Sequence, residues 1–124
     1  MTNRREFTRV PRRIETDVAT TTGTLEGWTQ DVSLKGIYFE CRTPQESDQP
    51  CRLTLYLDGR QGSARIEAEG QIARVERRGM AVEITELRGE QSYEHLKNLV
   101  IYNASDPEAA RAEFENHLGL KRRD

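Results

Sequence analysis

Arginines gather near the start of the chain in a spacing that suits anion binding. Arg5 and Arg9 are four residues apart, so their guanidiniums would share one side of either a helix or a strand. Arg4 stands beside the first of them, and between residues 4 and 13 only Glu6 carries a negative charge. Guanidinium forks match phosphate oxygens through paired hydrogen bonds. This stretch is therefore a candidate anion site, with a solvated basic tail as the alternative.

A second candidate site combines a carboxylate, a hydroxyl and a glycine at Asp31, Ser33 and Gly36. Asp and Ser hydrogen-bond nearby backbone and so favour turns, while glycine permits close approach by another group. From residue 37 to 41, apolar and polar residues alternate with the period of a half-buried strand. Taken alone, this combination is typical of a turn that leads into a strand.

The elements around these residues are expected to be six short strands. They are predicted near residues 12–21, 24–30, 36–41, 51–57, 64–76 and 80–84, separated by turns. In the fifth, the apolar parity slips between Ile72 and Ala73, which predicts a β-bulge or a strand that crosses between sheets. Short strands at this spacing favour a small antiparallel β-barrel, which leaves no exposed sheet edge.

Two helices are predicted after the strands. A helical stripe is formed by Tyr93, Leu96, Leu99, Val100 and Tyr102, and this helix is expected to cover one end of the barrel. Residues 105–108 resemble a capping box, so a second helix is expected to begin there. We therefore divide the chain into an arginine-rich arm (1–12), a barrel with its helix (13–104), and an extra helix with a basic tail (105–124). The extra helix is expected to pack on its own domain; docking on a partner or a second copy is the alternative.

Composition limits the function classes. The chain has 124 residues, 32% of them charged, and a formal net charge of -2, which indicates one globular domain and argues against nucleic acid polymers as partners. No apolar run is long enough for membrane insertion, so the default location is the cytoplasm. Cys41 and Cys51 are expected to be buried thiols. His95 and His117 lie on predicted helices with no catalytic or metal-binding constellation, so neither an enzyme nor a metal site is expected.

Together, the two candidate sites resemble the PilZ domain family. The family pattern is Arg-x-x-x-Arg followed by [Asp/Asn]-x-Ser-x-x-Gly, which is similar to residues 5–9 and 31–36 here. Residues 70–75 and 79–84 are similar to the family's closing hairpin, although Ile84 stands where an aromatic residue is more usual. The resemblance covers about residues 4 to 103. It implies a mostly β fold, a six-stranded antiparallel barrel with one or two C-terminal helices, that binds cyclic di-GMP, a bacterial second messenger.

The resemblance also implies roles for individual residues toward this ligand. Arg4, Arg5 and Arg9 would clamp phosphates and a guanine edge, whereas Asp31, Ser33 and Gly36 would form a platform for the base. We add Arg74, which stands where many relatives have a Trp or Arg that stacks on guanine; a plain surface arginine is the alternative. Trp28 could also stack, but a core position is favoured.

The implied function is that of a receptor or adaptor whose arm changes conformation when cyclic di-GMP binds and which relays the signal to an unidentified effector protein. Motility, biofilm formation and exopolysaccharide production are the processes such a relay would control. The alternative is a PilZ-like protein-interaction scaffold that does not bind the ligand. Either a monomer or a homodimer is compatible with the sequence, as is binding of one ligand or an intercalated pair.

Overall fold

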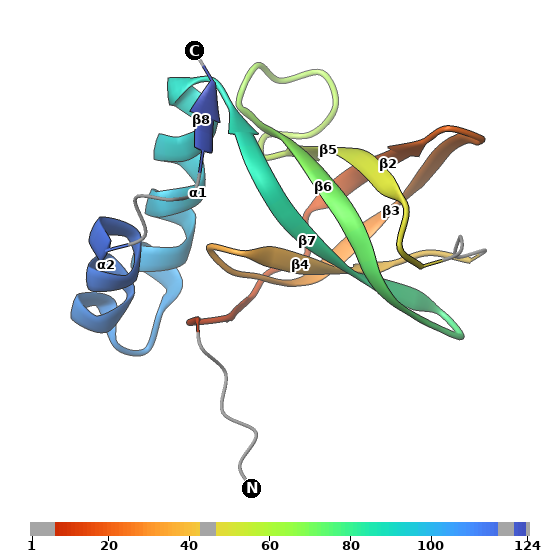
Figure 1. The fold of residues 1–124 in the computed structure, drawn as a ribbon. Coiled ribbons are helices and arrows are strands. Elements are labelled where there is room, and N and C mark those ends of the chain that lie inside the picture. Colours follow the sequence, from red (N-terminus) through yellow and green to blue (C-terminus); the bar gives the residue numbers. More distant parts are fainter. Residues whose placement is uncertain (1–6, 43–46, 117–120, 124) are drawn as a thin grey trace, which may run out of the picture.

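The structure, a computed structural model, describes residues 7–42, 47–116 and 121–123 (Figure 1). Strands form most of the regular secondary structure, and two helices lie between the last two strands. The strands are β1 (Val10–Pro11), β2 (Glu15–Thr20), β3 (Gly23–Val32), β4 (Gly36–Glu40), β5 (Pro50–Tyr56), β6 (Arg65–Glu76), β7 (Gly79–Arg88) and β8 (Lys121–Arg123). The helices are α1 (Glu90–Asn103) and α2 (Pro107–Asn116).

Six of the strands close into an antiparallel barrel. They pair in the order β3, β2, β5, β6, β7 and β4, and pairing between β4 and β3 closes the ring. This confirms the predicted fold class. Two short strands extend the sheet: β1 pairs with the end of β3, and β8 runs parallel to the end of β7.

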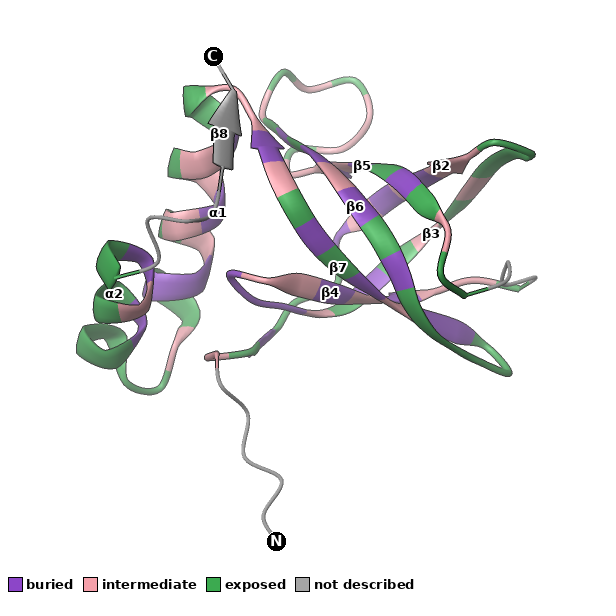
Figure 2. Cartoon of the chain, viewed as in Figure 1, coloured by how far each residue is buried: buried purple, intermediate pink, exposed green. Residues whose placement is uncertain are grey.

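The barrel interior is filled by alternating apolar side chains, as the sequence pattern predicted. In β5, Cys51, Leu53 and Leu55 are buried while the residues between them face outward (Figure 2). Phe39 of β4 and Met80 of β7 are fully buried in the same core. Because one face of each strand contributes to a single core, a one-residue slip in register would expose that whole face to solvent.

Helix α1 lies against β6 and β7 beside one end of the barrel (Figure 1). Its buried residues are Ser92, Leu96, Val100 and Ile101. The predicted stripe was therefore wrong at Tyr102, which is 79% exposed, because the buried face turns toward Ile101 instead. None of the helices in the described ranges is long and apolar enough to cross a bilayer.

Helix α2 packs on α1 through Ala110 and Phe114, both of which are buried. The rings of Phe114 and Tyr93 form an edge-to-face pair with a centroid distance of 6.0 Å. The helix begins one residue later than the capping box predicted: the amide of Ala109 donates to Asp106 Oδ1 at 3.2 Å, so Asp106 caps the helix. The sequence spacing of Ala110, Phe114 and Leu118 predicts an apolar face for this helix, and Leu118 lies outside the described residues.

Candidate functional site

The site begins with an irregularity in strand β3. Thr29 pairs with Phe39 and Asp31 pairs with Tyr38, so Gln30 is an extra residue that forms a β-bulge. Thr29 is buried in the barrel. In a regular strand Asp31 would face the same way as Thr29, since side chains alternate. The bulge shifts this parity and brings the Asp31 carboxylate to the outer face.

A second bulge does the same in strand β6. Ile72 pairs with Val82 and Arg74 pairs with Ala81, so Ala73 is the extra residue. This confirms the bulge predicted from the parity slip. Ile72 and Val82 are buried, whereas Arg74 is exposed. The extra residue therefore keeps the Arg74 side chain out of the core.

The two bulges place Asp31 and Arg74 in one row across four neighbouring strands. Asp31 of β3 lies opposite Tyr38 of β4, Tyr38 lies opposite Ala81 of β7, and Ala81 lies opposite Arg74 of β6. Residues that pair directly across a ladder carry their side chains on the same face. Residues far apart in the sequence thus lie along one row on the outside of the barrel.

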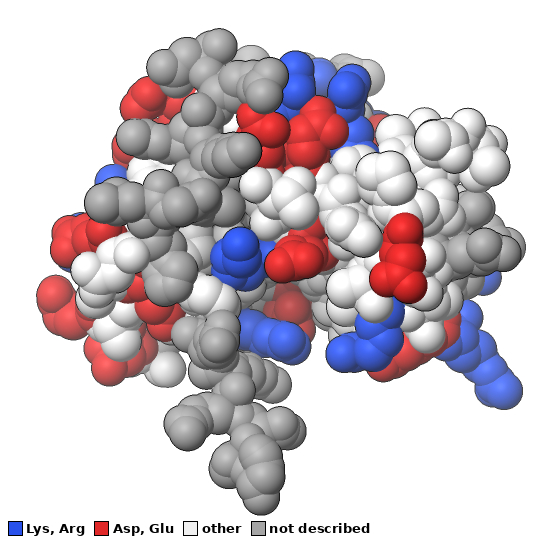
Figure 3. All heavy atoms as spheres, in the orientation of Figure 1, with Lys and Arg blue, Asp and Glu red and all other residues white. Residues whose placement is uncertain are grey.

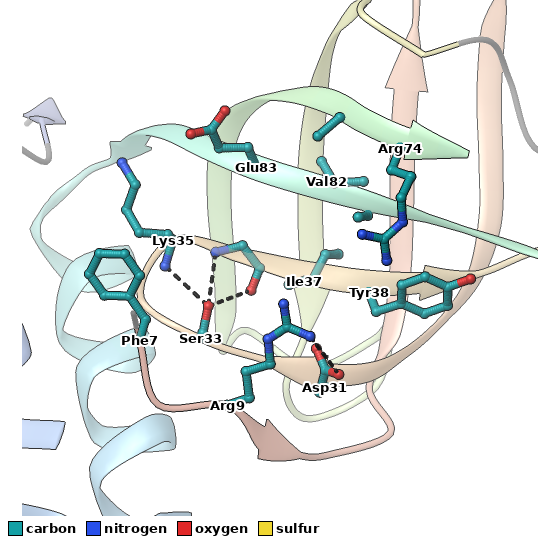
Figure 4. Close-up of a pocket in the computed structure, with 13 residues that line it drawn as sticks. Phe7, Arg9, Asp31, Ser33, Lys35, Ile37, Tyr38, Arg74, Val82 and Glu83 are labelled. Atoms are coloured by element: carbon teal, nitrogen blue, oxygen red, sulfur yellow. Dashed lines mark hydrogen bonds and ion pairs between the residues drawn. The ribbon is translucent and has the colours of Figure 1, made fainter. Parts of the chain in front are cut away.

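A hollow of about 190 Å³ lies along this row (Figure 4). Its lining combines basic, acidic and small apolar residues from the arm and from the outer face of the barrel. The lining residues are Phe7, Arg9, Asp31, Ser33, Lys35, Gly36, Ile37, Tyr38, Ala73, Arg74, Ala81, Val82 and Glu83. Five of the seven predicted site residues are thus brought together; Arg4 and Arg5 lie outside the described residues.

Arg9 reaches the hollow because the residues after it are held on the barrel. Val10 is buried, and Val10 and Pro11 pair with the last two residues of β3. Arg9 Nη1 lies 3.9 Å from Asp31 Oδ2, a loose ion pair whose side chains are 44% and 28% exposed. In Figure 4, Arg9 and Arg74 point into the hollow from opposite sides. Two guanidiniums therefore enter the same hollow, and Arg9 is the one that pairs with the carboxylate.

Ser33 braces the turn between β3 and β4. Its hydroxyl accepts from the amides of Lys35 and Gly36, at 3.3 and 3.2 Å, and lies 3.2 Å from the Gly36 carbonyl, to which it donates. The Ser33 amide donates to the same carbonyl at 2.8 Å. The hydroxyl thus has a structural role in fixing the turn that follows Asp31, although Ser33 also lines the hollow.

Gly36 is required by the neighbouring strand. A Cβ atom at this position would lie 2.4 Å from the carbonyl oxygen of Val82 on β7. Contacts this short do not occur between a Cβ and an oxygen, so a side chain would push β4 away from β7. The glycine therefore allows the close strand pairing that holds the site together.

Arg74 is held at one end of the row by Glu76. Arg74 Nε donates to Glu76 Oε2 at 3.0 Å, and the Tyr38 hydroxyl donates to Glu76 Oε1 at 2.8 Å. These two hydrogen bonds, first that of Tyr38, hold the pKa of Glu76 below its usual value. Burial and the same carboxylate raise the pKa of Tyr38, so the phenol stays protonated at neutral pH. Glu76 thus links the ring and the guanidinium that line the hollow.

Trp28 lies outside this site, and its predicted core position was wrong. It is 40% exposed, and the guanidinium of Arg13 lies 4.6 Å from its ring centroid. The reason is again parity: Trp28 precedes buried Thr29, so its side chain faces outward. Tyr38 was not among the predicted site residues but lines the hollow, and its alternation with Ile37 and Phe39 already indicated an outward position.

The chain belongs to the PilZ domain family. The family model matches residues 3–102, and PilZ domains are regulatory receptor domains that bind cyclic di-GMP. The match includes residues 3–12 of the arm, all six barrel strands and most of α1, but ends before α2. Among curated proteins, none matches the chain significantly.

Solved structures show the same fold. The inhibitor of motility MotI/DgrA from Bacillus subtilis superposes with a TM-score of 0.66 at 19% identity over 82% of this chain, which spans only 51% of that one. The PilZ domain of CeSA from a cellulose-synthesizing bacterium gives 0.59 at 22% identity, covering 76% of this chain and 95% of that one. The PilZ domain of YcgR from Escherichia coli, solved with c-di-GMP, gives 0.61 at 12% identity, covering 92% and 99%.

Proposed function

We propose that this protein is a cyclic di-GMP receptor or adaptor that binds the second messenger at the row from Asp31 to Arg74. The observation that carries the proposal is the convergence of Arg9, Asp31 and Arg74 on one hollow. Family membership supports the proposal, as does the structure of the PilZ domain of YcgR with c-di-GMP. We infer a cytoplasmic location for this chain.

The chemistry of these side chains suits the two halves of the ligand. A carboxylate accepts from the ring N–H and the exocyclic amine of guanine, so Asp31 would bind that edge of one base. Arginine forks bind phosphate oxygens and the O6/N7 edge of guanine, which suits Arg9 together with Arg4 and Arg5. The planar guanidinium of Arg74 would stack on a base.

We infer from the size of the hollow that the arm would complete the site. Its volume of about 190 Å³ is below the range of about 300–1,000 Å³ that is usual for pockets enclosing whole small ligands. The hollow would hold a guanine, while the phosphates lie at its open edge. We propose that Arg4 and Arg5 close over that edge. Since residues 7–12 are already held by contacts to the barrel and to α2, the conformational change would involve the part of the arm before Phe7.

The charge pattern of the surface fits a small anion better than a polymer. On the face shown in Figure 3, acidic and basic side chains of the described residues lie close to one another, without a long stretch of one sign. The whole chain has a formal net charge of -2. We propose that ligand binding changes the surface seen by an effector protein, in control of motility, biofilm or exopolysaccharide production.

Titration calorimetry with cyclic di-GMP tests the proposal, with GMP and GTP as controls. The expected result is saturable binding of cyclic di-GMP that the controls do not reproduce, and the same titration gives the stoichiometry. Absence of binding by folded protein would contradict the proposal and leave the protein-interaction scaffold as the function of this domain.

A further inference from the structure

Helix α2 contacts the arginine-rich arm directly. The amide of Thr8 donates to Glu113 Oε1 at 2.9 Å, and the Thr8 hydroxyl donates to Glu113 Oε2 at 2.7 Å. Both carboxylate oxygens are thus used by one residue of the arm. The two residues are 105 positions apart, and α2 lies beyond residues 3–102 that match the family model. The contact is therefore a feature that the family pattern does not account for.

Glu113 is presented by a firmly held helix. Its neighbour Phe114 is buried against Tyr93 of α1, and Ala110 one turn earlier is buried as well. The Tyr93 hydroxyl also donates to the Phe114 carbonyl, at 3.5 Å. Because this anchor fixes the backbone of α2 beside Glu113, the carboxylate is presented to Thr8 from a fixed position on the helix.

Thr8 is the residue between two that line the hollow. Phe7 packs partly against the core, and Arg9 forms the ion pair with Asp31. Buried Val10 follows directly. The arm is therefore held at Thr8 by α2 and at Val10 by the barrel, with Arg9 in between. Holding the backbone on both sides restricts the directions in which the Arg9 guanidinium can point.

We propose that Glu113 is a positioning residue that pre-organises the arm for ligand binding, and that α2 is thereby coupled to the ligand site. The inference rests on the proposed function, and extends it to a helix outside the family domain. Pre-organisation lowers the entropy that ligand binding must remove, so it raises affinity. By reciprocity, the bound ligand stabilises the docking of α2 by the same free energy.

Hydrogen exchange without ligand tests the contact between Thr8 and Glu113 by itself. Glu113→Ala should lower the protection of amides 7–10 by about tenfold, since charge-assisted hydrogen bonds to one residue are lost. The control is Glu115→Ala, which removes the same charge from an exposed position of the same helix. Protection of the barrel strands should stay unchanged in both variants. Equal protection of amides 7–10 in Glu113→Ala and wild type would overturn the proposal.

Calorimetry with cyclic di-GMP tests the coupling. Glu113→Ala should bind about five- to tenfold more weakly than Glu115→Ala, and Glu113→Gln, which keeps an acceptor for the Thr8 amide, should lie between them. Affinity equal to or higher than that of Glu115→Ala would overturn the proposal.

Should Glu113→Ala fail to fold, Thr8→Val removes the hydroxyl contact alone and should weaken binding severalfold. Failure of the wild type to bind cyclic di-GMP would instead refute the proposed function. Hydrogen exchange without ligand would then still test the contact between Thr8 and Glu113.

Discussion

Asp31 and Arg74 occupy the two ends of one cross-strand row, and each is brought to the outer face by a β-bulge just before it. Tyr38 and Ala81 lie between them on β4 and β7. Neither charged side chain would face this hollow in a regular strand, because the residues two positions earlier, Thr29 and Ile72, are buried. The ligand site we propose therefore depends on two local departures from regular pairing.

Truncation of the arginines should weaken cyclic di-GMP binding to different extents. Arg9→Ala, and likewise Arg5→Ala, should each cost about 2 kcal/mol or more of binding free energy, since charge-assisted contacts to phosphate are lost. Arg74→Ala should cost about 1 kcal/mol, as expected for loss of a stacking contact. Titration calorimetry measures both effects. Arg77→Ala, an exposed arginine of the β6–β7 turn, is the control; an equal loss there would mean that general charge, and not the site, determines affinity.

Gly36→Ala should destabilise the barrel before it affects any ligand. The new Cβ would lie 2.4 Å from the Val82 carbonyl oxygen, so β4 and β7 must separate locally. Overpacking of this kind costs about 1–3 kcal/mol of the free energy of unfolding. Urea denaturation followed by circular dichroism measures it. A variant as stable as the wild type would show that the strands can separate freely, and that the glycine is not needed for pairing.

Ser33→Ala tests the brace of the β3–β4 turn. Removing the hydroxyl leaves the amides of Lys35 and Gly36 without their described acceptor. The free energy of unfolding should fall by about 1 kcal/mol. In the same denaturation experiment, Ser63→Ala provides a loop serine as the control. Unchanged stability with lost ligand affinity would instead assign the hydroxyl to the ligand.

Stability should depend on pH through an ion-pair network on β2, remote from the site. Arg60 Nη2 lies 2.6 Å from Asp17 Oδ1, and Tyr56 donates to Asp17 Oδ2 at 2.8 Å. The hydrogen bonds from Arg60, more than those from Tyr56, hold the pKa of Asp17 below its usual value. The folded state therefore favours the ionised form of Asp17. Its contribution to the free energy of unfolding is complete above the pKa of about 3.9 in the unfolded chain. The contribution is lost as the pH falls through the lower pKa in the folded protein.

Asp17→Asn should accordingly lower the free energy of unfolding by about 1–2 kcal/mol at neutral pH. The difference from wild type should shrink as pH falls below about 4, because the wild-type carboxylate then becomes protonated. Denaturation at a series of pH values measures the difference. A difference in the free energy of unfolding that stays constant into the acid range would exclude the ion pair as its source.

The two cysteines should differ in reactivity. Cys51 is buried in β5, and burial raises the pKa of its thiol to about 11, so little thiolate is present at neutral pH. Cys41 is half-buried, which corrects the expectation that both thiols are buried. Iodoacetamide should therefore modify Cys41 first in the folded protein, as mass spectrometry of the labelled peptides would show. Faster labelling of Cys51 would contradict its burial.

Much of the fold was predictable because alternation in strands is visible in the sequence. The slip between Ile72 and Ala73 predicted the bulge in β6, since clear apolar residues stand on both sides of it. The bulge at Gln30 left no such trace, because its two neighbours, Thr29 and Asp31, are polar, and Trp28, the nearest apolar residue before it, is exposed. Hydrophobicity alone cannot tell which face a tryptophan occupies when a strand end is open to solvent.

The residues of the candidate site could be named from the sequence, but the contacts that hold them in place could not. The roles proposed for the arginines and for Asp31 come from their chemistry and from the family resemblance. The hydrogen bonds between Thr8 and Glu113 could not be predicted, because they depend on where α2 packs, and no local pattern encodes a contact between residues 105 positions apart. The use of the Ser33 hydroxyl inside its own turn likewise required the structure.

The most direct test of the central claim is a map of backbone amide chemical shifts during titration with cyclic di-GMP. The largest changes should fall on the row itself, at Asp31, Tyr38, Ala81 and Arg74, and on the turn from Ser33 to Gly36. Amides of β5, across the barrel, should change little. Changes that gather instead around Trp28, or their absence at saturating ligand, would contradict the account.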